Sequence, residues 1–528
     1  MKRYLKNFSL AIPFLFVGIA ALVACDFTQE SFKIHQALSN LMNDLHLGLI
    51  PLVLLGCTRA IYFAGEQTKS ISPPSISPRD EKTESISPAD EKIKLIFTVR
   101  SMDWSDPNIS TSLWASPIGS ARTAVGESDE DYPYTWESKY KSLVVCNYNK
   151  SATDGINEKG LVANLLFLLG ADYSHDINSK DKPRLQITAL AQYVLDNYAT
   201  VKEAVDGLKQ EPFFIVTSKL AVAKLNKETN EFDVDFKDIV LHLSVSDSQG
   251  DSAVFEYVKD DQSNNSKLLV YYVSEEEKVE GKETIAVLTN NLCAKQSELL
   301  NKFKKDNGDF DWAQKNEDFR WDELKNYDLN KELKKELNPA MNGSDIRFLR
   351  ASFYSNRLEK IDEVNDKNRR PFIDETKRDP ENLENSHSTW VENWSKSEGL
   401  ARAVSLIRNM STPLNVQAIN ENPFLAATVW RTVADHGNMR YFFELSRALY
   451  PLYVDLKELF TDLETVKKLD LYVPPAKEGE EGIDLLEDQL NKGEKIGKVN
   501  HLFENVKDNK WFYFDYQRPD TETSRPLH

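Results

Sequence analysis

Cys57 is the residue whose position in the chain most clearly suggests chemistry. It directly follows the apolar segment Leu45–Gly56, so cleavage after Gly56 would give a mature chain that begins with cysteine. The thiolate is the nucleophilic form of cysteine, and a base must take the thiol proton. No histidine has a local sequence context that recommends it as this base. The α-amine of an N-terminal cysteine, with a pKa near ~7.7–8.0, can serve instead.

Such a site needs a cation or acceptor that tunes the thiolate and the amine, a carboxylate that holds the amine, and donors for an oxyanion. Each donor contributes about 3 kcal/mol to the transition state. The segment Arg100-Ser101-Met102-Asp103-Trp104 offers the first two. We expect Cys57–Ala64 and Ile93–Arg100 to pair as an antiparallel hairpin that places Arg100 beside Cys57.

Three segments differ in composition from the rest of the chain. Residues 66–92 contain two near-copies of one Ser-Pro-rich charged unit, and this composition predicts a solvated, mobile loop at the far end of the hairpin. Residues 356–396 form an acidic insertion, and residues 469–528 form a C-terminal extension without an assigned structure. We therefore expect the catalytic domain to span residues 57–468.

The remaining patterns predict alternating groups of strands and helices. We expect strands at 143–148, 161–169, 239–246, 253–258, 267–273, 283–289, 427–435 and 439–445, and helices at 185–199, 201–208, 300–337 and 400–409. Consecutive strands are joined by short turns rather than by crossover helices. This order predicts an α+β fold with mostly antiparallel sheets.

The N-terminus has the pattern of an export signal. Lys2, Arg3 and Lys6 precede the apolar run Leu10–Val23, which is short for a membrane span. We expect a signal peptide at 1–25, a pro-segment at 26–56 and a periplasmic or secreted protein. Two interpretations of Cys25 remain open: it is lipidated and anchors the protein to the membrane, or it merely ends the signal peptide.

Composition excludes several other classes of function. The formal net charge of −18 argues against nucleic-acid binding, and the hydrophobic fraction of 41% is sufficient for a large core. Only four cysteines are present, so a disulfide framework is not implied. No Cys or His spacing is typical of a metal site, and we expect no cofactor.

Several motifs together resemble the choloylglycine hydrolase / penicillin V acylase family, in the branch from Gram-negative bacteria. They occur in the family's order over residues 57–460. The matching segments are Cys57-Thr58, Arg100–Trp104, Asp154–Leu161, Val287–Asn291, Gly343–Phe348 and Thr428–Asp435 with Arg440–Phe442. The pair Leu241-His242 and Glu256 also lie in a hairpin similar to one in that family.

The resemblance implies roles for individual residues. Arg100 would contact the nucleophile, Asp103 would bind the free amine, and Arg347 would be the last catalytic arginine. Asn290 and the backbone N–H of Phe167 would stabilise the oxyanion. Phe167 replaces the Asn of bile salt hydrolases, which argues against bile salts, and Leu292 replaces a proline, which predicts a different local loop shape.

The resemblance also implies a fold and a reaction. The fold would be the four-layer αββα sandwich of antiparallel sheets found in N-terminal nucleophile hydrolases, assembled as a homotetramer. The reaction would be hydrolysis of an N-acyl amide, namely penicillin V, an N-acyl homoserine lactone or a conjugated bile acid. Trp104 and Phe167 would line the acyl pocket or belong to the core.

Two other functions compete with this one. The first is a Cys–His protease with an internal Cys57 and a histidine such as His242 as its base. The second is a lipoprotein anchored at Cys25, whose inert hydrolase fold binds a ligand. The simplest structural readings are a buried Cys57, a surface ion pair of Arg100 and Asp103, and a surface or helix-capping Arg347.

Overall fold

The computed structural model describes fifteen parts of the chain. These are residues 56–69, 91–104, 109–124, 132–175, 181–217, 219–225, 232–263, 265–274, 286–302, 343–358, 398–414, 426–448, 450–473, 482–485 and 497–507. The predicted signal peptide, the pro-segment up to residue 55, residues 303–337 of the helix expected at 300–337 and most of both insertions lie outside these ranges. No helix within them combines the length and apolarity that a membrane crossing requires.

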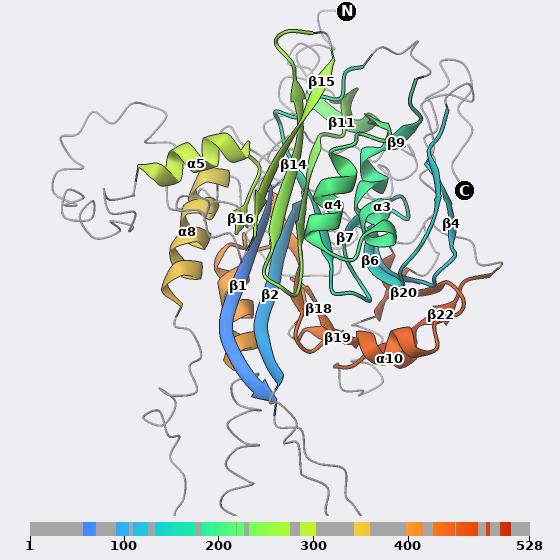
Figure 1. Ribbon diagram of the computed structural model, residues 1–528, viewed down its shortest axis with the longest axis vertical. Helices are drawn as coiled ribbons and strands as arrows, with labels where there is room; N and C mark the ends of the chain where they lie inside the picture. The colour runs from blue at the N-terminus through green and yellow to red at the C-terminus, as the bar shows by residue number, and fades with distance from the viewer. Residues whose placement is uncertain are drawn as a thin grey trace, which may run out of the picture.

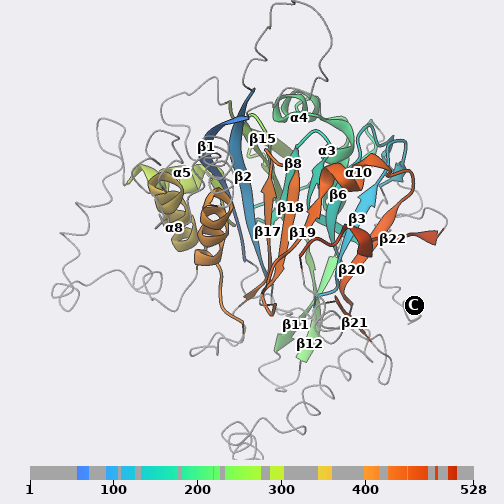
Figure 2. The same ribbon diagram turned by 90° about the horizontal axis from the view of Figure 1, so that it is seen from below.

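The candidate nucleophile Cys57 lies near the start of β1, which belongs to a six-stranded antiparallel sheet. The strand order in this sheet is β16-β1-β2-β17-β18-β19. Its strands are β1 (Gly56–Lys69), β2 (Glu91–Trp104), β16 (Val287–Leu288), β17 (Ala427–Asp435), β18 (Arg440–Leu445) and β19 (Leu452–Asp455). Because β1 and β2 are neighbours of β16 and β17, strands far apart in the sequence lie side by side in this sheet. Figure 1 shows β1 and β2 in blue beside β16, and Figure 2 shows β17 in orange beside β2.

A ten-stranded sheet packs against the first, and its main path runs β15-β14-β13-β8-β7-β6-β3-β20-β21. The strands are β3 (Thr111–Ser116), β6 (Ser142–Asn147), β7 (Ser151–Asn157), β8 (Val162–Phe167), β13 (Leu241–Ser246), β14 (Ser252–Lys259), β15 (Ser266–Val273), β20 (Lys467–Val473) and β21 (Ile483–Asp484), with β22 (Glu504–Asn505) paired to β20. All of these pairings are antiparallel.

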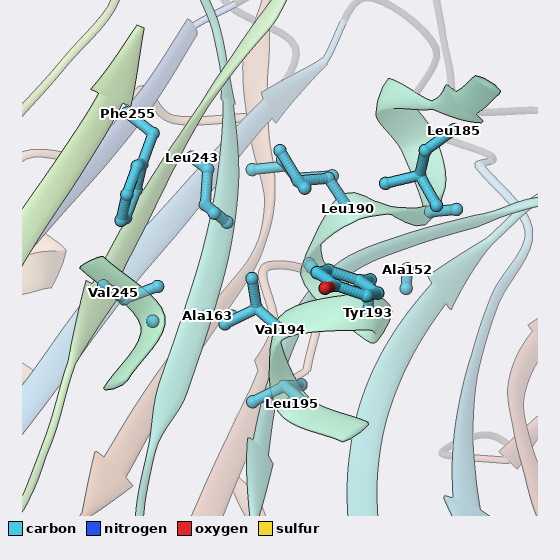
Figure 3. Close-up of a cluster of buried hydrophobic side chains, with 14 of the residues drawn as sticks. Ala152, Ala163, Leu185, Leu190, Tyr193, Val194, Leu195, Leu243, Val245 and Phe255 are labelled. Atoms are coloured by element: carbon cyan, nitrogen blue, oxygen red, sulfur yellow. The ribbon is translucent and has the colours of Figure 1, made fainter. Parts of the chain in front are cut away.

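Helices cover the outer face of the ten-stranded sheet. They are α3 (Leu190–Asn197) and α4 (Val201–Leu208), and Thr200 caps α4 by accepting a hydrogen bond from the Glu203 backbone N–H. Figure 3 shows Leu190 and Val194 of α3 directed toward Leu243 and Val245 of the sheet. Burial of these apolar side chains fixes the helices on the strands.

Another set of helices covers the outer face of the six-stranded sheet. It comprises α5 (Cys293–Asn301), α8 (Ser344–Arg357) and a helix at 398–409. Phe348 of α8 and Leu406 pack with Tyr62 and Phe97 of the sheet in one buried cluster. Figures 1 and 2 show α5 and α8 beside β1, on the side of the sheet away from α3.

A third buried cluster lies between the two sheets and includes Met102, Val145 and Trp430. The order of layers is therefore helix, sheet, sheet, helix. This arrangement confirms the αββα sandwich that the motifs implied, and it places Cys57, which is buried in the same cluster, at the centre of the molecule.

The β1–β2 hairpin confirms the predicted pairing and refines it. Cys57 lies opposite Met102, and Arg100 lies opposite Arg59, so Arg100 is a diagonal neighbour of Cys57 on the same face. The ladder continues to the pair Lys69 and Glu91, beyond the strand ends we expected. Residues 66–69 and 91–92 of the predicted insertion are therefore strand, and its remainder begins at the far end of the hairpin from Cys57.

Two expected boundaries differ in the structure. The helix predicted to start at 185 is an α-helix only from Leu190, because Arg184–Gln186 forms β9, which pairs with β10 (Phe214–Val216) before the 3₁₀ turn Ile187–Ala189. The long-range pairing overrides the local helical pattern. The sheet also continues across the boundary predicted after residue 468, since β20 pairs with β3.

The helix at 201–208, the turn at 436–438 and the other predicted strands correspond to elements in the structure within a few residues, except that the strand expected at 283–289 is described only from residue 286 and is strand at Val287–Leu288. Short elements that the sequence patterns did not indicate complete the described part. They are β4 (Ala121–Thr123) paired with β5 (Thr135–Glu137), β11 (Lys219–Leu225) paired with β12 (Phe232–Asp238), α10 (Leu456–Thr461) and the 3₁₀ turn Asn500–Leu502.

His436 joins the two sheets and makes stability depend on pH. Its ring nitrogens lie 2.9 Å from the Thr98 hydroxyl and 2.9 Å from the Gly160 carbonyl oxygen. Burial lowers the pKa of His436 to about 4. Because the folded protein binds this proton more weakly than the unfolded chain, acid favours unfolding as pH falls from about 6.5 to about 4.

We expect this group to remove roughly 2 kcal/mol of the free energy of unfolding between pH 7 and pH 5. Urea unfolding at the two pH values measures the loss. His436→Gln has no titrating ring, so the loss should be smaller by that amount in the variant. An equal loss in both proteins would contradict the assignment.

Candidate active site

Cys57 is buried at the start of β1, and its thiol points between the two sheets. Alternation along β1 and β2 puts Cys57, Arg100 and Met102 on that face. The Cys57 Sγ lies 3.7 Å from an Arg100 guanidinium nitrogen and 3.6 Å from the Met102 Sδ. The sequence-predicted cation therefore contacts the thiol, within a closely packed and largely apolar layer.

Arg100 is held by acceptors that the other sheet supplies. Its guanidinium donates to the backbone carbonyls of Thr153 and Leu165 and lies 3.4 Å from the Asp154 carboxylate. The same guanidinium lies over the Trp430 ring, 5.0 Å from its centroid. Arg100 and Asp154 are each 1% exposed, so their ion pair is buried. The surface pair of Arg100 and Asp103 considered from sequence is replaced by two buried pairs, because Asp103 pairs with Arg347.

Asp154 completes a polar network between the sheets. Its carboxylate accepts hydrogen bonds from the Thr432 hydroxyl at 3.0 Å and the Tyr441 hydroxyl at 2.7 Å. Burial raises the pKa of Asp154, and the positive charge of Arg100 and these hydrogen bonds oppose the rise. Thr432 and Tyr441 belong to the C-terminal hairpin and lie 278 and 287 residues after Asp154. This hairpin therefore fixes the carboxylate that pairs with Arg100 beside Cys57.

The opposite face of the same strands carries the second charged pair. Asp103 lies within hydrogen-bonding distance of Arg347 at 3.0 Å and accepts from the Thr428 hydroxyl at 2.5 Å. Burial raises the pKa of the Asp103 carboxyl, while the charge of Arg347 and the Thr428 hydroxyl oppose this rise. Both acidic and basic partners are buried, so Arg347 is not a surface residue.

Gly56 packs directly against this pair. A Cβ atom on Gly56 would lie 2.6 Å from an Arg347 guanidinium nitrogen and 2.8 Å from an Asp103 carboxylate oxygen, which is closer than real Cβ atoms approach. The peptide bond that precedes Cys57 therefore lies beside the predicted amine-binding carboxylate, in a space that accommodates glycine.

Asn290 connects Cys57 to the Asp103–Arg347 pair. Its Oδ1 accepts the Cys57 backbone N–H at 2.9 Å and an Arg347 N–H at 2.5 Å. Arg347 also lies 3.5 Å from the Cys57 carbonyl oxygen. The three polar groups of Cys57, namely its N–H, its carbonyl and its thiol, are thus contacted by Asn290, Arg347 and Arg100 respectively.

Phe167 lies on the other side of the Asn290 amide. The Asn290 Nδ2 donates to the Phe167 carbonyl at 2.8 Å and carries a second N–H. In an antiparallel strand the N–H and the C=O of one residue point to the same edge, so the Phe167 N–H is directed to the Asn290 side. The two sequence-predicted oxyanion donors are therefore brought together.

Trp104 belongs to an aromatic pair at the end of β2. Its indole N–H donates to the Tyr148 hydroxyl at 2.9 Å, and the ring centroids are 6.5 Å apart. Trp104 and Phe167 are each half-buried rather than core residues. Tyr148 was not selected from sequence, because a tyrosine in a turn after a strand carries no local signal of a partner 44 residues away.

Thr428 and Ser344 were also missed as individual residues, although both lie in segments that resemble family motifs. Thr428 binds Asp103, and the Ser344 hydroxyl accepts the Asn290 backbone N–H at 2.9 Å. Hydroxyl residues are frequent at strand and helix ends, so their types alone give no functional signal. Only the packing of α8 and β17 around Cys57 reveals their contacts.

His242 does not contact the candidate nucleophile. Its ring nitrogens lie 3.1 Å from the Glu256 carboxylate and 2.9 Å from the Thr289 carbonyl oxygen. Across the residues that the structure describes, no histidine forms a hydrogen bond with Cys57, and no group of three or more His, Cys, Asp or Glu side chains is arranged to hold a metal ion.

The αββα layers, with a cysteine near the start of β1, define an N-terminal nucleophile hydrolase fold. A solved structure of penicillin V acylase from Agrobacterium tumefaciens shares it, with a TM-score of 0.52 and 26% sequence identity over 87% of this chain and 100% of that one. Penicillin V acylase from Pectobacterium atrosepticum is 32% identical over 367 residues, which are 69% of this chain and 77% of the relative.

A sequence profile described as linear amide C–N hydrolases, choloylglycine hydrolase family, matches residues 84–275. The chain belongs to this family and is a linear amide C–N hydrolase. The resemblance inferred from the motifs is thereby confirmed.

The buried Arg100–Asp154 pair predicts a large effect of losing one charge. Asp154→Asn leaves Arg100 without its carboxylate between the sheets, and we expect the free energy of unfolding to fall by about 3–5 kcal/mol. Urea unfolding at pH 7 measures this change. The matched control is Asp206→Asn, which breaks the exposed pair with Lys202 and should change stability by less than about 1 kcal/mol. Similar losses in both variants would contradict a special role of burial.

Proposed function

We propose that Cys57 becomes the N-terminal nucleophile of the mature enzyme after removal of residues 1–56, and that it hydrolyses an N-acyl amide. The observation that carries this proposal is that three motif residues, Asn290, Arg347 and Arg100, all contact Cys57. Its N–H, carbonyl and thiol each contact a different residue that the motifs had selected, at 2.9, 3.5 and 3.7 Å. A buried structural cysteine does not require two arginines and an asparagine as partners.

The first half of the reaction forms a thioester. The free α-amine of Cys57 takes the thiol proton, and the thiolate attacks the amide carbonyl carbon. The oxyanion accepts hydrogen bonds from the Asn290 Nδ2 and the Phe167 N–H. When the C–N bond breaks, the protonated amine returns its proton to the leaving nitrogen, and the acyl group remains on Cys57.

The second half releases the acid. The Cys57 amine takes a proton from water, the resulting hydroxide attacks the thioester, and the thiol is restored as the carboxylic acid leaves. Arg100 supplies a fixed positive charge at the thiol throughout. Asp103 and Arg347 provide an anion and a cation at the amine side, where Gly56 packs before cleavage. Removal of residue 56 opens the space beside Asp103, so that its carboxylate can also bind the ammonium form of the amine.

Penicillin V is the substrate that we favour among N-acyl amides. Two relatives carry the name penicillin V acylase, and the half-buried Trp104 with Tyr148 provides an aromatic surface suited to an aryl acyl group. N-acyl homoserine lactones and conjugated bile acids are the alternatives. Phe167 in place of asparagine disfavours bile acids.

We further propose that the enzyme is exported and acts as a homotetramer in the periplasm or outside the cell. The basic and apolar N-terminal pattern supports export, and a lipid at Cys25 would add a membrane anchor. The Cys–His protease lacks support, because His242 binds Glu256 and Thr289. A ligand-binding lipoprotein would retain residues 26–56 and would tolerate Cys57→Ala.

The maturation step predicts a defined N-terminus. Mass spectrometry of the protein exported by its native pathway should give a chain that starts at Cys57. Gly56→Ala should slow its formation, because the added methyl group forces Arg347 and Asp103 apart at a cost of about 1–3 kcal/mol. Gly497→Ala is the matched control, since nothing lies within 4 Å of its Cβ. A mature chain that starts at Cys25 or Asp26 would contradict the mechanism.

The chemistry predicts a specific dependence on one thiol. The mature enzyme should convert penicillin V to phenoxyacetic acid and 6-aminopenicillanic acid, as measured by chromatography of both products. Cys57→Ala should lower kcat by at least about 10⁴-fold. Cys146→Ala is the control, because Cys146 is buried in the core under α3 and should leave hydrolysis unchanged. Equal hydrolysis by the Cys57 and Cys146 variants would exclude the proposed nucleophile.

A further inference from the structure

The peptide bond between Thr289 and Asn290 is held at both of its polar ends. Its carbonyl oxygen, on Thr289, lies 2.9 Å from the His242 Nε2, and its N–H, on Asn290, lies 2.9 Å from the Ser344 hydroxyl oxygen. A peptide unit is planar, so two anchors at opposite ends fix the orientation of the whole plane. The plane in turn determines where the Asn290 side chain begins.

His242 is an N–H donor to this peptide. A carbonyl oxygen only accepts, so the His242 Nε2 carries the proton. The His242 Nδ1 faces the Glu256 carboxylate at 3.1 Å, and the same carboxylate oxygen accepts the Cys293 backbone N–H at 2.9 Å. His242 and Glu256 are both fully buried, which makes this contact rigid and independent of solvent.

Ser344 holds the other end from the helical layer. Its hydroxyl lies 2.8 Å from the Thr289 hydroxyl, in addition to accepting the Asn290 N–H. Ser344 is the first residue of α8, and Arg347, one turn later in the same helix, donates to the Asn290 Oδ1 at 2.5 Å. The helix α8 therefore forms hydrogen bonds with both the backbone and the side chain of Asn290.

We propose that His242 and Ser344 are positioning residues that aim the Asn290 side chain at the oxyanion, with Glu256 holding the His242 ring. This inference rests on the proposed function, since it assigns a purpose to contacts behind the proposed oxyanion donor. The peptide is anchored from the sheet by His242 and from the helix by Ser344. Loss of one anchor lets the plane rotate and moves the Asn290 Nδ2 away from the developing charge.

The test uses Ser344→Ala, Ser344→Thr and, from the other side, His242→Gln, which keeps an N–H donor. Ser355→Ala is the matched control, because Ser355 lies in the same helix and its hydroxyl donates to the Ser352 carbonyl, away from Asn290. With penicillin V, we expect Ser344→Ala to lower kcat by about 10- to 100-fold with KM within about threefold, because the lost contact acts in the transition state. Ser344→Thr and His242→Gln should retain most of the activity.

Alkylation of Cys57 by iodoacetamide distinguishes a misplaced Asn290 side chain from a general disruption of the site. Alkylation needs a reactive thiol but forms no oxyanion. Its rate should be unchanged in Ser344→Ala. The proposal is overturned if Ser344→Ala hydrolyses as fast as Ser355→Ala, or if hydrolysis and alkylation fall together.

Deuterium exchange at the Asn290 amide gives a readout that does not require turnover. If the wild-type enzyme hydrolyses no N-acyl amide, the proposed function fails. Deuterium exchange still tests whether the Ser344 hydroxyl holds the Asn290 N–H. Ser344→Ala should exchange this hydrogen faster than Ser355→Ala does. Equal exchange in the two variants would overturn the positioning role.

Discussion

The Arg100 guanidinium, buried between two sheets, is the feature on which the rest of the site depends. A cation at 1% exposure is tolerated only where charge and hydrogen bonds replace water, and here Asp154 and the carbonyls of Thr153 and Leu165 replace it. These partners belong to the ten-stranded sheet, whereas Arg100 belongs to the six-stranded one. The two sheets must therefore pack in one register before the cation is satisfied, and the same register delivers it to the Cys57 thiol.

The strand that carries Cys57 separates two kinds of chemistry. Its inner face presents the thiol to Arg100 and Met102, and the outer side presents the preceding peptide bond to Asp103 and Arg347. Asn290 reaches the Cys57 N–H from the end of β16, so it bridges both sides. In a chain that begins at Cys57, the thiol and the amine would thus have separate electrostatic environments a few ångströms apart, as an enzyme that uses one residue as nucleophile and base requires.

Much of the site was predictable from sequence, because strand pairing has a simple period. If Cys57–Ala64 and Ile93–Arg100 pair over their full lengths, Arg100 lies beside Cys57. The observed ladder places the two residues diagonally opposite each other. The sequence could not indicate that β1 and β2 continue to Lys69 and Glu91, since charged residues carry no strand signal by themselves. The early start predicted for α3 was wrong for a related reason, because β9 gains a partner in β10 that is 30 residues away.

By itself, the sequence determined which residues could act, since Cys57, Arg100, Asp103, Asn290 and Arg347 stand in ordered motifs, and it determined the antiparallel α+β class through its short turns. Only the tertiary structure decided how those residues are held. The contacts of Thr428 with Asp103, of Tyr441 with Asp154 and of His242 with the Thr289 carbonyl join segments separated by 47 to 325 residues. The physical reason is that hydrogen bonds and burial depend on which surfaces meet in space, and no local period in the chain encodes that meeting.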